Sequence, residues 1–441
     1  MKNILKTLTP IFVILVIFCS CGNKHSLNYD YNTDKRAPQK YPDVRFAVIS
    51  DIHVYIQELG STGSAFEKVM LSDRKLLLDS IDLLDFGINE IIASDVNFVL
   101  IPGDLTKDGE LINHRIVAEK LNILKEAGIK AYVVPGNHDV NNTEAFSFKG
   151  DTKTIVPTIS EQEFAQNYAD FGFKDAIMRD SESLSYLTEL CPGLLLLALD
   201  ATRHRENTQG HHPIVGGKIN QQTADWIALA LREADKRNAA VIAMMHHGFM
   251  EHWKGQKKLH PDYIILDFEN FSKFLASWNV RVGFTGHYHA HDVTRSDFNG
   301  KYMYDIETGS LITAPCPIRY VQIKNNTLTI RSDFIVDKLH PGTDFAAKAK
   351  SFVKQTVMLE ASSTLRKFRV SENDIAIIAD AVGDAFNAHY SGDENPGLRK
   401  TLDKSKLGLW GKFVLSVQQY VLDGLWKDLT PSDINLSISL D

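Results

Sequence analysis

The sequence predicts an α/β fold built around a largely parallel sheet. Of its 441 residues, 44% are hydrophobic and 23% are charged, a composition typical of globular proteins that bury a sizeable core. From Arg45 onward, short apolar runs alternate with amphipathic segments, which is the pattern of repeated βα units. Acidic, amide and imidazole side chains follow several of these runs, at the place where ligands bind in sheets of this kind.

The apolar runs define six predicted strands, and the segments between them predict helices. Two helical patterns, Leu76–Ile92 and Leu111–Ala127, flank the second run. Gly128 follows the later helical pattern, in the position where glycine commonly ends a helix. The predicted strands are Phe46–Ile49, Asn97–Ile101, Ala131–Val134, Leu194–Leu199, Ala240–Met245 and Val280–Phe284.

The overall charge argues against one class of partner. The chain has 48 Lys and Arg residues against 55 Asp and Glu residues, a net charge of −7. Without an overall basic field a protein does not gather nucleic acid by counterion release, so no specific nucleic acid binding is expected. Beyond the N-terminal region only Cys191 and Cys316 remain, too few to predict a disulfide.

Residues 1–20 are predicted to be a lipoprotein signal peptide. Lys2 and Lys6 precede the apolar run Ile11–Cys19, which is shorter than the ~20 residues that span a bilayer. The small residue Ser20 precedes Cys21, and this stretch resembles a bacterial lipobox, in which that cysteine is acylated. A plain signal peptide and an N-terminal anchor helix are the alternatives. We therefore expect a lipid-anchored, extracytoplasmic protein on the periplasmic or cell-surface side of a bacterial membrane.

The next segment, residues 21–42, is expected to be a flexible tether between the lipid and the folded protein. It is rich in polar residues, contains Pro38 and Pro42, and shows neither helical nor strand periodicity.

The ends of the first three predicted strands carry residues suited to metal binding. Asp51 and His53 are two residues apart on an extended segment, so both side chains point to one side and can share a cation. Gly103 allows a sharp turn that presents the carboxylate of Asp104 to two ions. Asn137 offers an amide oxygen as a further ligand.

The next residues, His138 and Asp139, are candidates for proton transfer. An imidazole beside an acid can donate or accept a proton, with the acid setting the tautomer or raising the pKa of the imidazole. His138 is our candidate for stabilising the transition state or protonating the leaving oxygen.

Histidines end the last two predicted strands. His246 and His247 follow the fifth, and because adjacent strand residues face opposite ways, only one of them should bind a metal. His287 and His289 follow the last strand and face one way. Seven oxygen and nitrogen ligands are too many for one tetrahedral ion, and with Asp104 shared they suit two ions. The candidate ligands are Asp51, His53, Asp104, Asn137, His246, His287 and His289.

The ordered motifs D-x-H, G-D, G-N-H-D, H and G-H-x-H resemble those of the calcineurin-like metallophosphoesterase superfamily, over Arg45 to roughly Asp333. The resemblance implies two facing mixed sheets flanked by helices. It also implies that Asp51, His53, Asp104 and His289 hold one metal, while Asp104, Asn137, His246 and His287 hold the other. His246 rather than His247 is the ligand by motif match.

Departures from the patterns of subfamilies narrow the prediction. Lys107 stands where purple acid phosphatases have a tyrosine, so a tyrosine-bound ferric ion is not expected. The motif ends in Asp139, where protein Ser/Thr phosphatases have a glutamate. The stretches Gly103–Glu110, Leu199–Ala201 and Gln221–Trp226 are instead similar to a bacterial phosphodiesterase branch.

The expected function is therefore that of a dinuclear phosphohydrolase, and specifically a phosphodiesterase, acting on a small-molecule phosphate ester. Two cations roughly 3.5 to 4 Å apart would share a water, and the resulting bridging hydroxide would attack phosphorus in line. Mixed carboxylate, amide and imidazole ligands accept Mn, Fe or Zn. A phosphomonoesterase, a nucleotide or sugar pyrophosphatase, and a non-catalytic binding protein on the same fold are the alternatives.

Several other residues have two possible interpretations. His114 either supports the metal ligands from behind or lies on a helix surface, and the surface position is favoured. The loop after Leu199 carries cationic side chains that bind a phosphate or are simply solvated. Residues 141–184 form a long connection that is expected to pack partly on itself and to determine substrate choice. The cationic loop residues are Arg203, Arg205, His211 and His212.

The chain divides into two folded parts near residue 336. Residues 43–335 are the predicted catalytic domain. Beyond Pro341 the pattern changes to a helical period, with Ser371 as a helix cap and an apolar stripe that includes Ile375, Ile378 and Phe386. Residues 336–441 are therefore expected to form a C-terminal helical domain or appendage that packs on the catalytic part.

Overall fold

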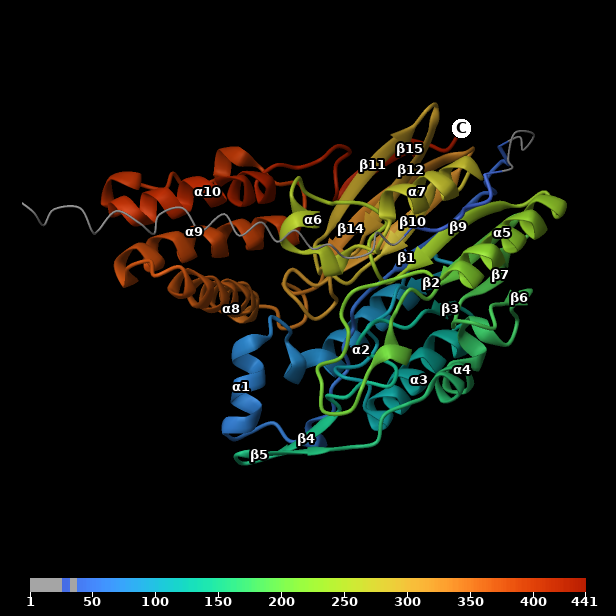
Figure 1. The fold of residues 1–441 in the computed structure, drawn as a ribbon. Coiled ribbons are helices and arrows are strands. Elements are labelled where there is room, and N and C mark those ends of the chain that lie inside the picture. The colour runs from blue at the N-terminus through green and yellow to red at the C-terminus, as the bar shows by residue number, and fades with distance from the viewer. Residues whose placement is uncertain (1–25, 32–37) are drawn as a thin grey trace, which may run out of the picture.

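The computed structural model describes residues 26–31 and 38–441. Two large mixed sheets form the centre of the protein, with helices around them (Figure 1). The predicted signal peptide, residues 1–20, and the predicted acylation site at Cys21 lie outside the described residues. Among the helices of the described part, none is both long enough and apolar enough to cross a bilayer.

The first sheet has six strands, and its parallel part carries the early motifs. Strands β1, β2 and β3 are parallel, whereas β13, β14 and β15 extend the sheet beyond β1 in antiparallel pairs. In sheet order these strands are β15 (Asn435–Ser439), β14 (Thr327–Phe334), β13 (Pro317–Lys324), β1 (Val44–Val48), β2 (Phe98–Ile101) and β3 (Lys130–Val133).

The second sheet has seven strands, and its centre is also parallel. Strands β8, β9, β10 and β12 run in one direction, and antiparallel neighbours complete both edges. In sheet order the strands are β11 (Asp292–Phe298), β12 (Lys301–Glu307), β10 (Val282–Thr285), β9 (Ala240–Met245), β8 (Leu194–Leu199), β7 (Tyr186–Cys191) and β6 (Met178–Arg179).

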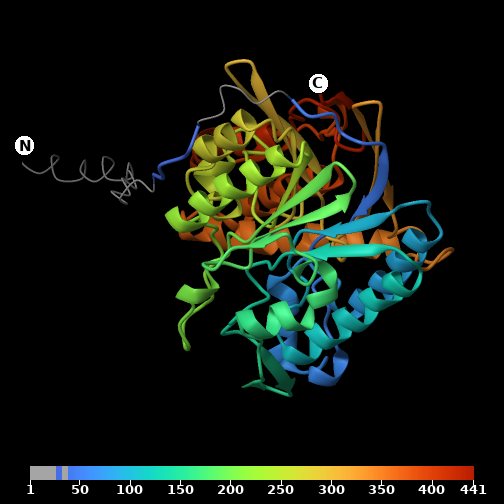
Figure 2. The same ribbon diagram turned by 90° about the vertical axis from the view of Figure 1, so that its right-hand side faces the viewer.

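Helices cover the outer faces of the two sheets. Helices α2 and α3 lie on one side of the paired sheets, and α5 and α7 lie on the other (Figure 2). A separate hairpin joins β4 (Phe146–Lys149) to β5 (Thr152–Ile155). The helices are α1 (Ser64–Ser72), α2 (Ser80–Ile92), α3 (Leu111–Glu126), α4 (Glu161–Asn167), α5 (Gln221–Lys236), α6 (Gln256–Leu259), α7 (Phe268–Ser277), α8 (Phe345–Lys367), α9 (Glu372–Ser391) and α10 (Leu409–Leu425).

Strand β8 shows why its sequence is an uninterrupted apolar run. All six of its residues are buried. Leu194, Leu196 and Ala198 join the core between the two sheets. The alternate residues pack under α5 and α7, and these are Leu195, Leu197 and Leu199. A strand covered on both faces needs apolar residues at every position, which identifies a central strand of a layered α/β fold.

The predicted architecture of the catalytic part is confirmed. β8 and β9 have the predicted bounds, and β1, β2, β3 and β10 differ from their predicted ranges by one or two residues at an end. The structure also contains the two facing mixed sheets that the family resemblance implied. Gly128 has a φ of +82°, as expected of a glycine that ends a helix.

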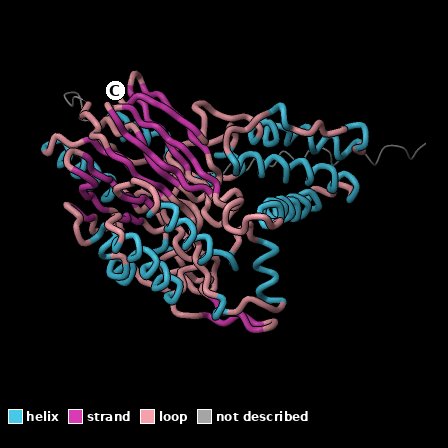
Figure 3. The backbone as a smooth tube through the Cα atoms, turned by 180° about the vertical axis from the view of Figure 1, so that it is seen from behind, coloured by secondary structure: helices cyan, strands magenta, loops and turns pink. Residues whose placement is uncertain are grey.

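The C-terminal region departs from the prediction of a purely helical appendage. Helices α8, α9 and α10 lie beside the ends of the strands (Figure 3), and Ser371 caps α9 through the amide of Asp374, as predicted. The chain then returns to the first sheet as β15, which pairs with β14. Leu436, Ile438 and Leu440 are buried there, so the last residues complete the sheet of the catalytic part.

Part of the segment expected to be a flexible tether is bound to the folded protein. The amide of Asn28 donates to Gln221 on α5 at 2.9 Å. The ring of Tyr29 stacks on Phe274 of α7, with 5.1 Å between centroids. Tyr41 is buried, and its hydroxyl donates to the carbonyl of Val241 at 3.2 Å. The described residues between 26 and 42 therefore contact the second sheet and its helices.

Candidate metal centre

The structure brings the seven predicted ligands together at one edge of the two sheets. They follow the carboxyl ends of β1, β2, β3, β9 and β10. Because these strands are parallel within each sheet, their carboxyl ends meet at the same edge. Six of the ligands are at most 5% exposed, and the side chain of His289 is 11% exposed. Apolar strands thus hold charged and imidazole side chains inside the protein.

One group of potential ligand atoms lies at the ends of β1 and β10. Asp51, His53 and His289 each offer an atom within 4.8 Å of the others. Oδ1 of Asp51 is 3.4 Å from Nε2 of His289, and Nε2 of His53 is 3.3 Å from that same nitrogen. This composition, one carboxylate and two imidazoles, suits a transition-metal ion.

A second group contains Asp104, His246 and His287. Oδ2 of Asp104 is 3.3 Å from Nε2 of His246, and the amide oxygen of Asn137 is 3.1 Å from the same nitrogen. Asp104 also faces the first group, since its Oδ2 is 3.4 Å from Nε2 of His53. One carboxylate therefore lies between the two groups, as the sequence predicted for a shared ligand.

The hydrogen bonds on the outer side of the rings fit metal binding. Nδ1 of His246 is 2.9 Å from the carbonyl oxygen of Pro102, and Nδ1 of His53 is 3.3 Å from the carbonyl oxygen of Thr106. A carbonyl accepts only, so each Nδ1 must carry the hydrogen, and in the neutral ring Nε2 then presents a lone pair to the centre. This is how metal-binding histidines are held in place, so the residues fit a pair of cations.

The electrostatics of three ligands agree with metal binding. Burial and the cation of Lys75 hold the pKa of His53 well below its usual value, and burial beside His247 does the same for His287. Burial alone would raise the pKa of Asp104, but the surrounding imidazoles hold it well below the usual range. His246 differs, because Asp104 outweighs the effect of burial and raises its pKa to about 9. A cation at the centre would take the place of that proton.

The ligand-bearing turns have an unusual backbone conformation. Five of the seven ligands have a positive φ, from +35° at His53 to +79° at His287. A non-glycine residue in this region costs on the order of 1 kcal/mol or more, and such residues cluster at functional sites. The five are Asp51, His53, Asp104, His287 and His289.

Two motif glycines leave room for the carboxylates. A Cβ on Gly136 would lie 2.1 Å from Oδ1 of Asp104, and a Cβ on Gly286 would lie 2.3 Å from Oδ2 of Asp51. No side chain fits at either position without displacing a ligand. The glycine before Asn137 and the glycine before His287 are therefore required if the carboxylates of Asp104 and Asp51 are to keep their positions.

His138 lies beside the two groups, but its acidic partner is not the one we expected. Nε2 of His138 is 3.9 Å from Oδ2 of Asp104, and Nδ1 is 2.8 Å from Oδ1 of Asp108. Asp139 instead accepts hydrogen bonds from the amides of Leu105 and Gly136, at 3.1 and 2.8 Å. Asp139 thus holds two ligand-bearing turns together and does not contact the His138 ring.

Asp108 links His138 to a buried cation. Its other oxygen forms an ion pair with Lys107, the residue that occupies the tyrosine position of purple acid phosphatases. Burial opposes a charge on His138, but Asp104 and Asp108 together raise the pKa of its ring. Asp108 lies in the turn that follows the ligand Asp104. This short spacing along the chain could have indicated that Asp108 is near His138.

His114 and His247 illustrate what burial decides. The expected surface position of His114 is wrong: it is fully buried, with Nε2 2.8 Å from the carbonyl oxygen of Asp139. Its spacing along α3 from Val117 and Leu121, both buried, places it on the inner face, and this pattern could have identified it. His247 points away from the two groups, since its Nε2 is 2.9 Å from the carbonyl oxygen of Val215.

Acidic side chains lie beside three of the four candidate phosphate-binding residues after β8. Arg205 is bound to Glu161 through two contacts of 2.5 and 2.7 Å, and Arg203 pairs with Glu206. His212 is 2.7 Å from Glu144. These pairs favour the interpretation that the loop is a solvated surface.

The long connection packs partly on itself, as expected, with Phe164, Tyr168, Phe171 and Phe173 buried.

Lys75 is a residue that the sequence analysis missed. It is 7% exposed and lies between α1 and α2, where its charge lowers the pKa of both His53 and His138. Its nearest acidic partner is Asp73, at 3.6 Å. No strand-end motif marks this position, because it belongs to an irregular segment far from the ligands along the chain.

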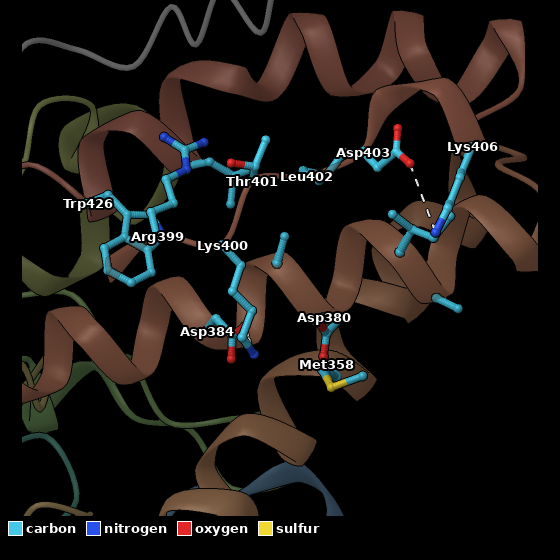
Figure 4. Close-up of a pocket in the computed structure, with 14 residues that line it drawn as sticks. Met358, Asp380, Asp384, Arg399, Lys400, Thr401, Leu402, Asp403, Lys406 and Trp426 are labelled. Atoms are coloured by element: carbon cyan, nitrogen blue, oxygen red, sulfur yellow. Dashed lines mark hydrogen bonds and ion pairs between the residues drawn. The ribbon is translucent and has the colours of Figure 1, made fainter. Parts of the chain in front are cut away.

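A surface cavity of about 490 Å³ lies elsewhere, among α9, α10 and the segment 399–406 (Figure 4). Asp380, Asp384, Arg399, Lys400 and Trp426 are among the residues that line it. It shares no residue with the candidate metal ligands, and its acids and bases largely pair with one another, as Lys400 does with Asp384 at 3.0 Å.

Comparison with known proteins identifies the family. The family model for calcineurin-like phosphoesterases matches residues 44–291, and the chain belongs to this family of metal-dependent phosphoesterases. The family implies a dinuclear metal site, and the two groups that share Asp104 provide the candidate ligands. The identity of the metal is not fixed by these ligands.

Individual relatives are distant. An uncharacterized metallophosphoesterase-like protein of Bacillus subtilis (strain 168), YydB, is 31% identical over 121 residues, which are 27% of this chain and 22% of that protein. A dimetal phosphatase from Danio rerio is 16% identical, covering 66% of this chain and 96% of the other, with a TM-score of 0.45. Purple acid phosphatase PPD1 from yellow lupin (Lupinus luteus) is 13% identical over 68% of this chain and 52% of the other, with a TM-score of 0.43.

Proposed function

We propose that this protein is a dinuclear metallohydrolase that cleaves phosphodiesters of small molecules. The observation that carries the proposal is the pair of buried acid and histidine groups that share Asp104 at the carboxyl ends of parallel strands. Bound cations of this kind lower the pKa of water and neutralise charge on the phosphoryl oxygens. Complete ligand groups also favour turnover over a purely binding role.

The residues of the chain contribute orientation and proton transfer. Carbonyl oxygens of Pro102 and Thr106 fix the rings of His246 and His53, so little reorganisation is needed when the substrate binds. The side chain of His138 is 26% exposed, and its Nδ1–H donates to the carboxylate of Asp108. It is therefore placed to hold a proton on Nε2 and to deliver it to the leaving oxygen.

The distribution of positive charge favours a diester over a monoester. A diester carries one negative charge near neutral pH and a monoester carries close to two. Lys75 is a buried cation near His53 and His138, whereas Arg203 and Arg205 are paired with glutamates. Few fixed cations remain to hold the additional charge of a monoester. We expect Lys75→Ala to raise KM several-fold, with a smaller effect on kcat.

The test is a comparison of two substrates on one preparation. The protein is stripped of metal, reloaded with Mn²⁺, and assayed with bis(p-nitrophenyl) phosphate and p-nitrophenyl phosphate. A kcat/KM at least about tenfold higher for the diester supports the proposal, a difference of about 1.4 kcal/mol in transition-state stabilisation. A preference for the monoester would favour a phosphomonoesterase, and release of phosphate or nucleotide from a pyrophosphate would favour a pyrophosphatase. No hydrolysis by metal-loaded protein would favour a binding role.

We also propose that the protein is an extracytoplasmic lipoprotein anchored through Cys21. The short apolar run and the lipobox-like stretch support this localisation. Expression in a bacterial host with a radiolabelled fatty acid tests it: the wild-type chain should be labelled and partition with membranes. Cys21→Ser should be unlabelled. Equal labelling of the two proteins would contradict the assignment.

A further inference from the structure

A second set of buried acidic and imidazole side chains lies where the end of α9 meets the start of β11. Asp292 opens β11, His389 is in the last turn of α9, and Glu394 follows that helix. We call these three residues the interface cluster. Asp292 and His389 are 1% exposed and Glu394 is 6% exposed. Each offers one potential ligand atom, and the three atoms lie within 4.8 Å of one another.

The distances within the cluster converge on one nitrogen. Nδ1 of His389 is 2.5 Å from Oε1 of Glu394 and 4.0 Å from Oδ2 of Asp292. The other oxygen of Asp292 is 2.7 Å from Nδ1 of the fully buried His252. Asp292 is thus oriented from behind by an imidazole, in the way that outer hydrogen bonds orient the carboxylates that bind metals.

Two buried polar atoms of the cluster are left unsatisfied. Among the atoms of the described residues, Oε2 of Glu394 and Nε2 of His389 are buried and have no hydrogen-bond partner. Buried polar groups in folded proteins are nearly always paired, so such atoms point to a bound ion or water at this position. Oε2 of Glu394 belongs to the carboxylate that faces Nδ1 of His389, so this oxygen points to a ligand within the cluster. Nε2 of His389 lies on the opposite edge of the ring.

Acidic groups outnumber cations among the described residues around the cluster. Burial opposes a charge on His252, but Asp305, Glu307 and Asp292 raise its pKa well above the usual value, so one imidazolium faces three carboxyl groups. Burial raises the pKa of the neighbouring Glu307 well above its usual value, although His252 opposes the shift. The guanidinium of Arg319 donates to the backbone carbonyl oxygens of Asp433 and Glu307, at 2.5 and 2.6 Å. It therefore satisfies peptide groups and does not contact the carboxylates. The buried carboxyl groups of this region include Asp292, Asp305, Glu307, Glu394 and Asp433.

We propose that the interface cluster binds a divalent transition-metal ion, through carboxylate oxygens of Asp292 and Glu394 and a ring nitrogen of His389. Two oxygens and one imidazole suit Mn²⁺ or Zn²⁺. The ion holds the C-terminal helices against the second sheet. It also fixes the start of β11, which lies three residues after the ligand His289.

The site is tested by counting metal in the full-length protein. After removal of metal and reloading with Mn²⁺ alone, wild-type protein should bind one more equivalent than Glu394→Gln or His389→Gln. The matched control is His340→Gln, which changes an exposed histidine of the same C-terminal region and should retain the wild-type count. Equal counts for wild type and Glu394→Gln would show a metal-free pair in which His389 and Glu394 share a proton, and would overturn the proposal.

A second measurement separates this site from the dinuclear centre. In an Asp104→Asn background the interface ion should remain, and Mn²⁺ should slow proteolysis of the segment 345–425 at least about tenfold. Adding Glu394→Gln should abolish that protection. Protection that persists in the double variant would overturn the proposal. Metal that is lost because of Asp104→Asn alone belongs to the dinuclear centre and does not bear on the interface ion. Circular dichroism verifies that each variant folds. If His389→Gln does not fold, the conclusion rests on Glu394→Gln, which conserves the volume of the side chain.

Discussion

The candidate metal centre and the interface cluster are both buried sets of carboxylates and imidazoles, but they are constructed differently. The centre takes its residues from the ends of parallel strands, each directly after an apolar run. The interface cluster takes one residue from β11, one from α9 and one from the loop beyond it. The shared edge of a sheet makes the first set recognisable in the sequence, whereas the second exists only once the C-terminal helices have packed.

The backbone differs between the two regions as well. Five ligands of the centre have positive φ values, while Asp292, His389 and Glu394 are not among the residues with positive φ. Strained backbone persists where surrounding structure enforces a particular geometry for chemistry. We therefore assign catalysis to the first region and attachment of the C-terminal helices to the second. The following predictions test that division.

The largest effect is expected for Asp104→Asn. This change weakens the ligand that faces both groups, so metal content should fall and kcat/KM should drop by about 10³-fold or more, since bound ions supply several kcal/mol of transition-state stabilisation. Metal analysis and the diester assay measure both quantities. Activity within tenfold of wild type would remove Asp104 from its central position.

The next effect is expected for His138→Ala. If this residue protonates the leaving oxygen, kcat should fall by about 10²-fold while both ions of the centre stay bound. A substrate whose leaving group needs no proton, such as a p-nitrophenyl ester, should lose less activity than an alkyl ester. Equal losses on both substrates would argue against proton donation.

A smaller effect is expected for Asp108→Asn, because Asp108 acts through His138. Loss of this hydrogen-bond partner should lower kcat by about tenfold. The double variant with His138→Ala should be no slower than His138→Ala alone, since the two residues form one unit. Additive losses would mean that Asp108 has a separate structural role.

The smallest effect on turnover is expected in the interface cluster. Glu394→Gln should change kcat/KM by less than about threefold, because the residues of the cluster are not among the candidate metal ligands or proton donors. The same variant should lose the Mn²⁺-dependent part of its thermal stability. A loss of activity comparable to that of His138→Ala, in protein that retains the dinuclear ions, would break the division between the two regions.

Much of the catalytic part could be predicted from the sequence, for a specific physical reason. Strands such as β8 are covered on both faces and are therefore apolar throughout. The polar residues that follow such strands lie where ligands bind in sheets of this kind, so a change from apolar to polar residues marks them in the sequence. Asp51 and Asp104 could be predicted as neighbours because the parallel strands β1 and β2 end at one edge of the first sheet. His246 follows β9 of the second sheet and meets them because the two sheets face each other, as the family resemblance implied.

The features that the sequence did not reveal depend on contacts between distant segments. β15 is a short edge strand in which Leu436 and Ile438 alternate with polar residues, too brief a pattern to separate from a loop. The partner of His138 turned out to be Asp108, because Asp139 is occupied by backbone amides. Lys75 approaches the centre from an irregular segment. None of these contacts follows from local periodicity.

The most direct test of the central claim is a metal titration of stripped, full-length protein with diester hydrolysis as the readout. We predict negligible hydrolysis without metal and full recovery once Mn²⁺ has filled both groups that share Asp104, with no recovery in Asp104→Asn. Hydrolysis that is unchanged by complete removal of metal, or that recovers equally in Asp104→Asn, would contradict the account.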